Sequence, residues 1–180
     1  MQTGTCSTTT VCEMNTSQLM RAIKSDLEIH SLCLGVFASD QIPKRTAGCM
    51  IVNEEDSSKG GSHWIALFVL PDNKIEYFDS YGRAKMVPKI ATFLKPFDVT
   101  RSKTQMQSNF SSCCGQHCLY YLWHRCRGLT FAEIMGTYGS NQQDNDSEVT
   151  EFVNDTFGLD TEPVDVEFTV QQICKVLTPT

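Results

Sequence analysis

The sequence predicts an α+β domain in which helices flank a central mixed or antiparallel sheet. In residues 63–80, two short apolar runs are separated by a turn sequence, which indicates a β-hairpin. Before this block, and again after residue 114, apolar residues recur at the three- and four-residue spacing of helices. A hairpin between helical segments is typical of an α+β domain.

The first half of the chain supplies a helix and the strands. Helical spacing predicts a helix over 17–28. Its N-cap candidates are Asn15, Thr16 and Ser17. Residues 49–53 indicate a short buried strand. The run 63–70 is almost continuously apolar and too short for most helices, so we expect a strand covered on both faces. A turn at 71–74 then leads into a partner strand at 75–80.

The second half is predicted to be mostly helical. We expect a helix over 88–95, a strand within 97–106, and further helices that begin at Cys114, Thr130, Ser147 and Thr169. Thr130 and Glu133 form a capping-box pattern. Gly128 and Gly158 are expected to end the helices that precede them.

Size and composition indicate one globular domain. The 180 residues are 41% hydrophobic and 20% charged, and they can bury a core of their own. We expect residues 1–15 to be a flexible lead-in and residues 16–180 to form a single domain. No run approaches the ~18 apolar residues of a membrane span, and no secretory signal precedes the domain. The net charge of −6 argues against nucleic acid as a main partner. We expect the protein to be intracellular, and we expect it to be a monomer.

A cysteine at a predicted helix start is the most informative feature. The chain has nine cysteines and no secretory signal, so free thiols in a reducing compartment are expected. At Cys114 a polar stretch enters an apolar-faced helix, and unpaired N–H groups at a helix start favour the reactive thiolate. The amide of Cys114 can donate to a developing oxyanion. Gly115 is expected to let the backbone approach a substrate closely.

A nucleophilic thiol needs a base and a group that orients the base. Among the four histidines, His63 alone stands where a Gly-Gly loop enters a central strand. If the hairpin turn centres on residues 72 and 73, position 63 pairs with positions 79 to 82. The spacing therefore places the carboxylate of Asp79 beside His63. Gln107 can reach an oxyanion with its side-chain amide.

The joint motif resembles the adenain family, the adenovirus-type maturation cysteine proteases, and the related SUMO-protease clan. It consists of His63-Trp64, Phe78 to Gly82, and Gln107 seven residues before Cys114. The similarity covers roughly residues 17–126 and includes 19–27 and 51–53.

This resemblance implies a papain-like or adenain-like fold and a cysteine peptidase that needs neither a metal nor another cofactor. Cys114 is then the nucleophile, His63 the base, Asp79 the orienting carboxylate and Gln107 an oxyanion donor. Trp64 and Gly61 would bind substrate, with Trp64 beside a narrow channel that admits small residues before the cut.

The chain departs from adenovirus enzymes in three respects. Asp79 stands where they carry Glu, the stretch 97–106 has no cysteine for an activating peptide, and the chain is acidic. These departures suggest a distant relative from a Maverick/Polinton or adintovirus-like element. Its substrates would be capsid or core precursors, cleaved in host cytoplasm or nucleus or within the virion. The need for an activating peptide stays open.

Other interpretations compete with this one. Cys113 adjoins Cys114, but the following glycine and the spacing from Gln107 favour Cys114. An isopeptidase that removes a ubiquitin-like modifier would share the same site. A non-enzymatic zinc-binding module would use Cys113, Cys114, His117 and Cys118, which crowd one helical face. An inactive relative that only binds is a further alternative, although all four expected catalytic side chains are present.

Overall fold

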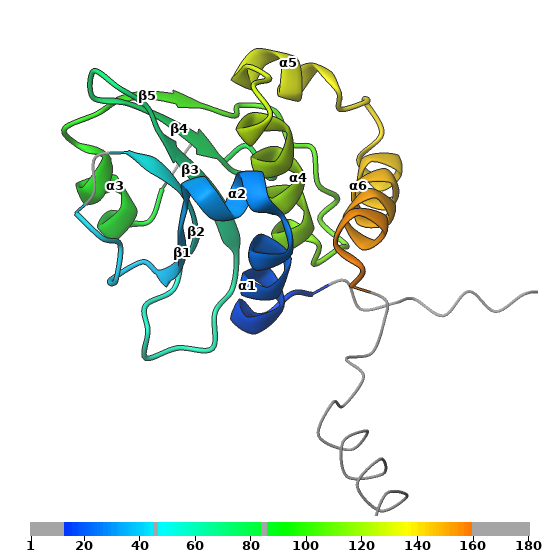
Figure 1. Ribbon diagram of the computed structural model, residues 1–180, viewed down its shortest axis with the longest axis horizontal. Coiled ribbons are helices and arrows are strands. Elements are labelled where there is room, and N and C mark those ends of the chain that lie inside the picture. Colours follow the sequence, from blue (N-terminus) through cyan, green and yellow to red (C-terminus); the bar gives the residue numbers. More distant parts are fainter. Residues whose placement is uncertain (1–12, 45–46, 84–85, 160–180) are drawn as a thin grey trace, which may run out of the picture.

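A five-stranded mixed sheet organises the protein (Figure 1). The structure is a computed structural model that describes residues 13–44, 47–83 and 86–159. Along the sheet the strands are β1 (Cys33–Ala38), β2 (Gly48–Asn53), β3 (Trp64–Val69), β4 (Lys74–Phe78) and β5 (Asp98–Arg101). The helices are α1 (Thr16–Ser25), α2 (Leu27–Leu32), α3 (Pro88–Leu94), α4 (Cys114–Cys126), α5 (Phe131–Gly136) and α6 (Gln142–Phe157).

The centre of the sheet is antiparallel and its two outer pairs are parallel. The β3–β4 hairpin turns at Asp72 and Asn73, whose positive φ angles suit the tight turn expected from the sequence. Ala66 pairs with Phe78 in the hairpin. Continued past the strand ends, this register sets His63 opposite Tyr81, within the range predicted from the spacing.

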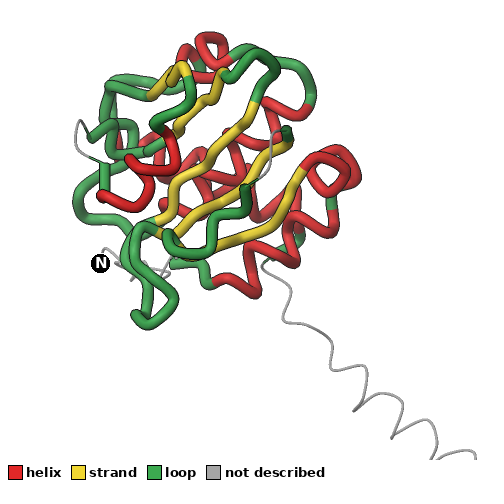
Figure 2. Tube along the Cα trace, turned by 90° about the vertical axis from the view of Figure 1, so that its left-hand side faces the viewer, coloured by secondary structure: helices red, strands yellow, loops and turns green. Residues whose placement is uncertain are grey.

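Two hydrophobic cores cover the two faces of the sheet. Trp64 and Ala66 of β3 face a core shared with α1, α2, α4, α5 and α6, whereas Ile65 and Leu67 face a second core closed by α3. Figures 1 and 2 show that helices lie on both sides of the strands. The alternation confirms that β3 is a central strand buried on both faces.

The structure corrects several predicted boundaries. The helix expected over 17–28 is two helices, because Asp26 ends α1 and caps α2 by accepting from the Ile29 amide at 3.0 Å. Strand β1 was not predicted, since its residues are all half-buried and show no alternation. The strand expected in 97–106 is limited to β5, and α6 begins at Gln142 because Asn141 caps a polar first turn.

Other predictions about the chain are met or fall outside the described residues. Asn15 is the N-cap of α1, and Thr130 forms the capping box of α5. Met14, which we assigned to the lead-in, is buried in the core. Residues 1–12 and the helix expected from Thr169 lie outside the described residues. Within the described ranges, no helix is both long and apolar enough to cross a membrane.

Candidate active site

Three elements meet at one edge of the sheet and bring the predicted triad together. His63 immediately precedes β3, Asp79 immediately follows β4, and Cys114 is the first residue of α4. Antiparallel pairing of β3 and β4 puts the beginning of one beside the end of the other. Cys114 is 7% exposed and lines a cleft, whereas its neighbour Cys113 is fully buried. The thiol that a substrate can reach is therefore Cys114.

His63 links the carboxylate to the thiol. Its Nε2 atom lies 2.8 Å from Oδ1 of Asp79, and both side chains are buried. Nδ1 is the ring atom left for the hydrogen bond with Cys114. Burial opposes protonation of the ring, but the hydrogen bonds with Asp79 and Cys114 outweigh it and raise the pKa of His63 to about 9. At neutral pH the ring is an imidazolium that can pair with a thiolate.

Asp79 is held from several sides. Its Oδ1 also accepts from the Tyr81 amide at 3.0 Å, and its Oδ2 accepts from Nε of Arg83 at 3.2 Å. Ser102 hydrogen-bonds the backbone N–H and carbonyl of Asp79. Burial acts to raise the pKa of Asp79, but His63 and Arg83 lower it below its usual value. Sequence reasoning missed Arg83 and Ser102, because no motif links them to the triad.

The side chain of Asn53 links the two ends of the loop before His63, beside a backbone hydrogen bond from Glu54 to His63. Oδ1 of Asn53 accepts from the amides of Glu55 and Ser62 at opposite ends of this loop. Gly61 has a φ of +86°, and a Cβ there would come within 2.8 Å of Nδ2 of Asn53. Gly61 also lines the cleft. The glycine is thus needed for the loop that delivers His63, a reason separate from substrate binding.

Gln107 lies fully buried on the loop that leads into α4. Its Oε1 accepts from the Ser80 hydroxyl at 2.6 Å, and its Nε2 donates to the Ser111 carbonyl at 3.1 Å. Because its carbonyl oxygen is engaged by Ser80, the orientation of the amide is fixed. The role of Gln107 as an oxyanion donor stays a prediction.

Helix α6 holds the backbone on both sides of Gln107. Nδ2 of Asn145 donates to the Met106 carbonyl at 3.1 Å, and Oδ2 of Asp146 accepts from the Ser108 amide at 3.0 Å. Neither side chain was predicted, because the helix expected there began at Ser147. Asn145 and Asp146 instead lie in the polar first turns of α6, where the side-chain amide N–H of Asn145 and the carboxylate of Asp146 face the loop.

The cleft next to Cys114 has a volume of about 860 Å³. Its walls come from the segment before α1, the end of β1, the loop before His63 and the residues just before α4. Trp64 contributes to the wall and is 9% exposed, and its Nε1 donates to the Met14 carbonyl at 2.8 Å. The indole therefore ties the N-terminal segment to the site while presenting part of its surface to the cleft.

Two expectations around α4 need correction. Gly115 does not face the cleft: a Cβ there would lie 3.0 Å from Cβ of Met14, so the glycine lets α4 pack against the N-terminal segment. The four proposed zinc ligands also do not converge. Cys114 lines the cleft and Cys118 is buried in the core, whereas Cys113 and His117 approach Asp146.

Comparison with known proteins establishes the fold. Neither a family model nor a curated protein matches the sequence. The chain is similar in structure to the Chlamydia trachomatis effector protein Cdu1, solved bound to ubiquitin, with a TM-score of 0.55, 14% identity, and coverage of 85% of this chain and 96% of that one. For the central domain of the uncharacterized Lpg1148 protein from Legionella pneumophila, these values are 0.52, 11%, 82% and 97%.

The chain also aligns with the ASFV pS273R protease at 18% identity and a TM-score of 0.41, covering 57% of this chain. It spans only 43% of that protease. The predicted fold class, an α+β cysteine protease fold with a central sheet flanked by helices, is confirmed. At these identities the chemistry has to be argued from the site itself.

Proposed function

We propose that the protein is a cysteine peptidase of the adenain/SUMO-protease clan, with Cys114 as its nucleophile. The observation that carries this proposal is the alignment of Asp79, His63 and Cys114 along one hydrogen-bonded path that ends in an open cleft. A buried histidine–carboxylate pair beside a thiol at a helix start is an arrangement that supports thiol-dependent acyl transfer.

In the proposed reaction, the Cys114 thiolate attacks a peptide carbonyl that lies in the cleft. The developing oxyanion accepts from the Cys114 amide and from Nε2 of Gln107. His63 then protonates the leaving amine, and water hydrolyses the resulting thioester, returning the proton to His63. Asp79 holds the imidazole with Nδ1 toward the sulfur. All of these groups belong to the chain, so the reaction requires no cofactor.

We further propose that the scissile bond follows a small residue, as in Gly-Gly or Gly-x-Gly sequences. The motif resemblance supports this specificity, as does the position of Trp64 in the wall of the cleft near Cys114. The same resemblance supports substrates among the capsid or core precursors of a virus or transposon. Both proposals are narrower than the reaction class. Either can be wrong while the protein is still a cysteine peptidase.

A second candidate function is removal of a ubiquitin-like modifier. It is favoured by the fold shared with Cdu1, a protein whose structure was solved bound to ubiquitin. An isopeptidase would use the same triad and would also accept small residues before the cut. The two functions differ in what the cleft must bind: a short peptide alone, or the extended end and folded body of a modifier.

A substrate panel distinguishes these functions. Purified protein is given short peptides containing Gly-Gly or Gly-x-Gly sites and, separately, ubiquitin-like modifiers carrying a reporter at the C-terminus. Cleavage of the peptides supports an endopeptidase, and rapid release from modifiers without peptide cleavage supports the isopeptidase. Turnover of neither class, by protein shown to be folded, would contradict the proposed peptidase.

A further inference from the structure

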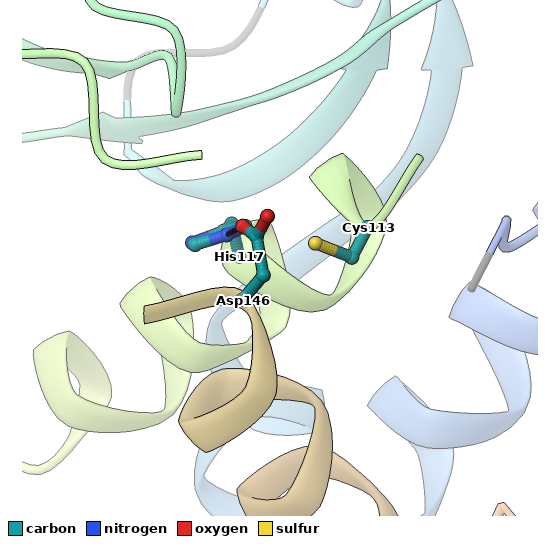
Figure 3. Close-up of side chains that lie close together, drawn as sticks. All are labelled: Cys113, His117 and Asp146. Carbon is teal, nitrogen blue, oxygen red and sulfur yellow. Dashed lines mark hydrogen bonds and ion pairs between the residues drawn. The ribbon is translucent and has the colours of Figure 1, made fainter. Parts of the chain in front are cut away.

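Beside the triad, and outside its hydrogen-bonded path, lies a second group of cysteine, histidine and aspartate side chains. Figure 3 shows Cys113 and His117 at the beginning of α4 and Asp146 on α6 turned toward one another. Each offers one ligand atom, and these three atoms lie within 4.8 Å of one another. Cys113 and His117 are fully buried, and Asp146 is 9% exposed. The proposed peptidase reaction assigns no chemical step to this group, although Asp146 also holds the backbone next to Gln107.

We propose that Cys113, His117 and Asp146 bind one Zn²⁺ ion that braces the junction between α4 and α6. A thiolate, an imidazole and a carboxylate are the ligand types that zinc takes in proteins, with bonds of about 2.0–2.3 Å. Ligand atoms around a tetrahedral zinc are then roughly 3–4 Å apart. The separations within this group are close to that range, so small side-chain movements suffice.

The contact between His117 and Asp146 marks the position of the metal. Nε2 of His117 lies 2.9 Å from Oδ1 of Asp146, a hydrogen-bond distance. A zinc ion would replace the shared proton and widen this separation by on the order of half an ångström, given its bond lengths. The Cys113 thiol lies on the same side, since it also hydrogen-bonds with the Asp146 carboxylate.

The outer atoms of these ligands already have partners of the kind found around zinc sites. Nδ1 of His117 lies 3.3 Å from the Tyr138 hydroxyl, and Oδ2 of Asp146 accepts from the Ser108 amide at 3.0 Å. Such partners fix the ligating atom and its direction. The Ser111 hydroxyl lies 3.3 Å from the Cys113 sulfur, as a further outer partner. The partners of His117 and Asp146 thus direct Nε2 and Oδ1 toward the ion, on the side where the Cys113 sulfur also lies.

The charge of the group also suits a dication. With the Cys113 thiol deprotonated, the thiolate and the Asp146 carboxylate carry two negative charges, which Zn²⁺ neutralises. In a buried site this matters because an uncompensated charge is costly to desolvate. The ion would join the N-cap of α4 to α6, next to the Cys114 that begins the helix.

The test is zinc binding by the full chain carrying Cys114→Ala, which excludes the catalytic thiol as a ligand and does not depend on activity. After zinc loading and desalting, elemental analysis is expected to give one zinc per chain. Adding Cys113→Ser should weaken binding by at least about 100-fold, more than the ~10–100-fold loss expected for Tyr138→Phe, which removes only an outer partner. Cobalt binding to the Cys114→Ala chain should give a thiolate-to-metal absorption band, a readout that survives if the second variant unfolds.

Cys126→Ser is the matched control, because the Cys126 thiol belongs to a separate group with Cys49 and Cys33 at the other end of α4. It should leave zinc binding unchanged. The proposal is overturned if the Cys114→Ala chain retains no zinc, if Cys126→Ser abolishes binding, or if Cys113→Ser leaves the affinity unaltered. Zinc held only when Cys114 is intact would assign the ion to the catalytic pair instead.

Discussion

Nε2 of His63 lies 2.8 Å from Oδ1 of Asp79, and both side chains are buried at the open end of the β3–β4 hairpin. This contact decides which ring nitrogen serves the nucleophile, because it leaves Nδ1 for Cys114. It also supplies the negative charge that keeps the ring protonated against the opposing effect of burial. The hairpin register therefore sets both the geometry and the charge state of the proposed base.

Replacing Asp79 with Asn should move the alkaline limb of kcat/KM to lower pH. In the unmodified chain the active pair loses its proton as pH rises through the pKa of His63, about 9. Without the carboxylate the imidazolium is less stable, so this pKa falls, by roughly one to three pH units for a partner at this range. A pH–rate profile from pH 5 to about 10 measures the limb. Asp98→Asn, which removes an exposed carboxylate on β5, should leave it in place.

Replacing Gln107 with Ala should lower kcat by about 10²–10³ with little change in KM, the expected effect of losing one oxyanion donor. Steady-state kinetics on the best peptide of the panel provide the measurement. Gln107→Glu keeps the shape but removes the donated N–H groups, and it should be as impaired. Wild-type kcat in either variant would remove Gln107 from the reaction.

We expect Asn145 to affect kcat by holding the backbone next to Gln107 in place. Asn145→Ala releases the Met106 carbonyl and should lower kcat, whereas the double variant with Gln107→Ala should be no slower than Gln107→Ala alone. Additive losses would mean that Asn145 acts elsewhere. Asn141→Ala, which removes the N-cap of α6, controls for loss of helix stability and should show no such coupling with Gln107.

Gly61 and its neighbour Gly60 form a matched pair for the loop before His63. Gly61→Ala places a Cβ against Asn53 at a left-handed φ, which should cost about 1–2 kcal/mol of unfolding free energy and reduce kcat. Gly60→Ala meets no atom within 4 Å and should change stability by less than about 0.5 kcal/mol. Denaturant unfolding of both variants checks this. Equal losses would exclude the backbone as the cause.

The sequence predicted the parts of the site that depend on local pattern. The continuous apolar run of β3, the turn at 71–74 and the helix at Cys114 are each visible in a short window, and the first two together place His63 beside Asp79. Contacts between distant segments could not be predicted in this way. Ser80 with Gln107, Asn145 with Met106 and Trp64 with Met14 are set by how α4, α6 and the N-terminal segment pack on the sheet.

Covalent labelling of the nucleophile tests the central claim most directly. A peptide probe ending in a glycine vinyl sulfone is incubated with the full chain, and the modified cysteine is located by mass spectrometry. We predict one label, on Cys114, that disappears in Cys114→Ala, is strongly reduced in His63→Ala and persists in Cys126→Ser. Labelling of another cysteine, or labelling of Cys114 that does not depend on His63, would contradict the proposed active site.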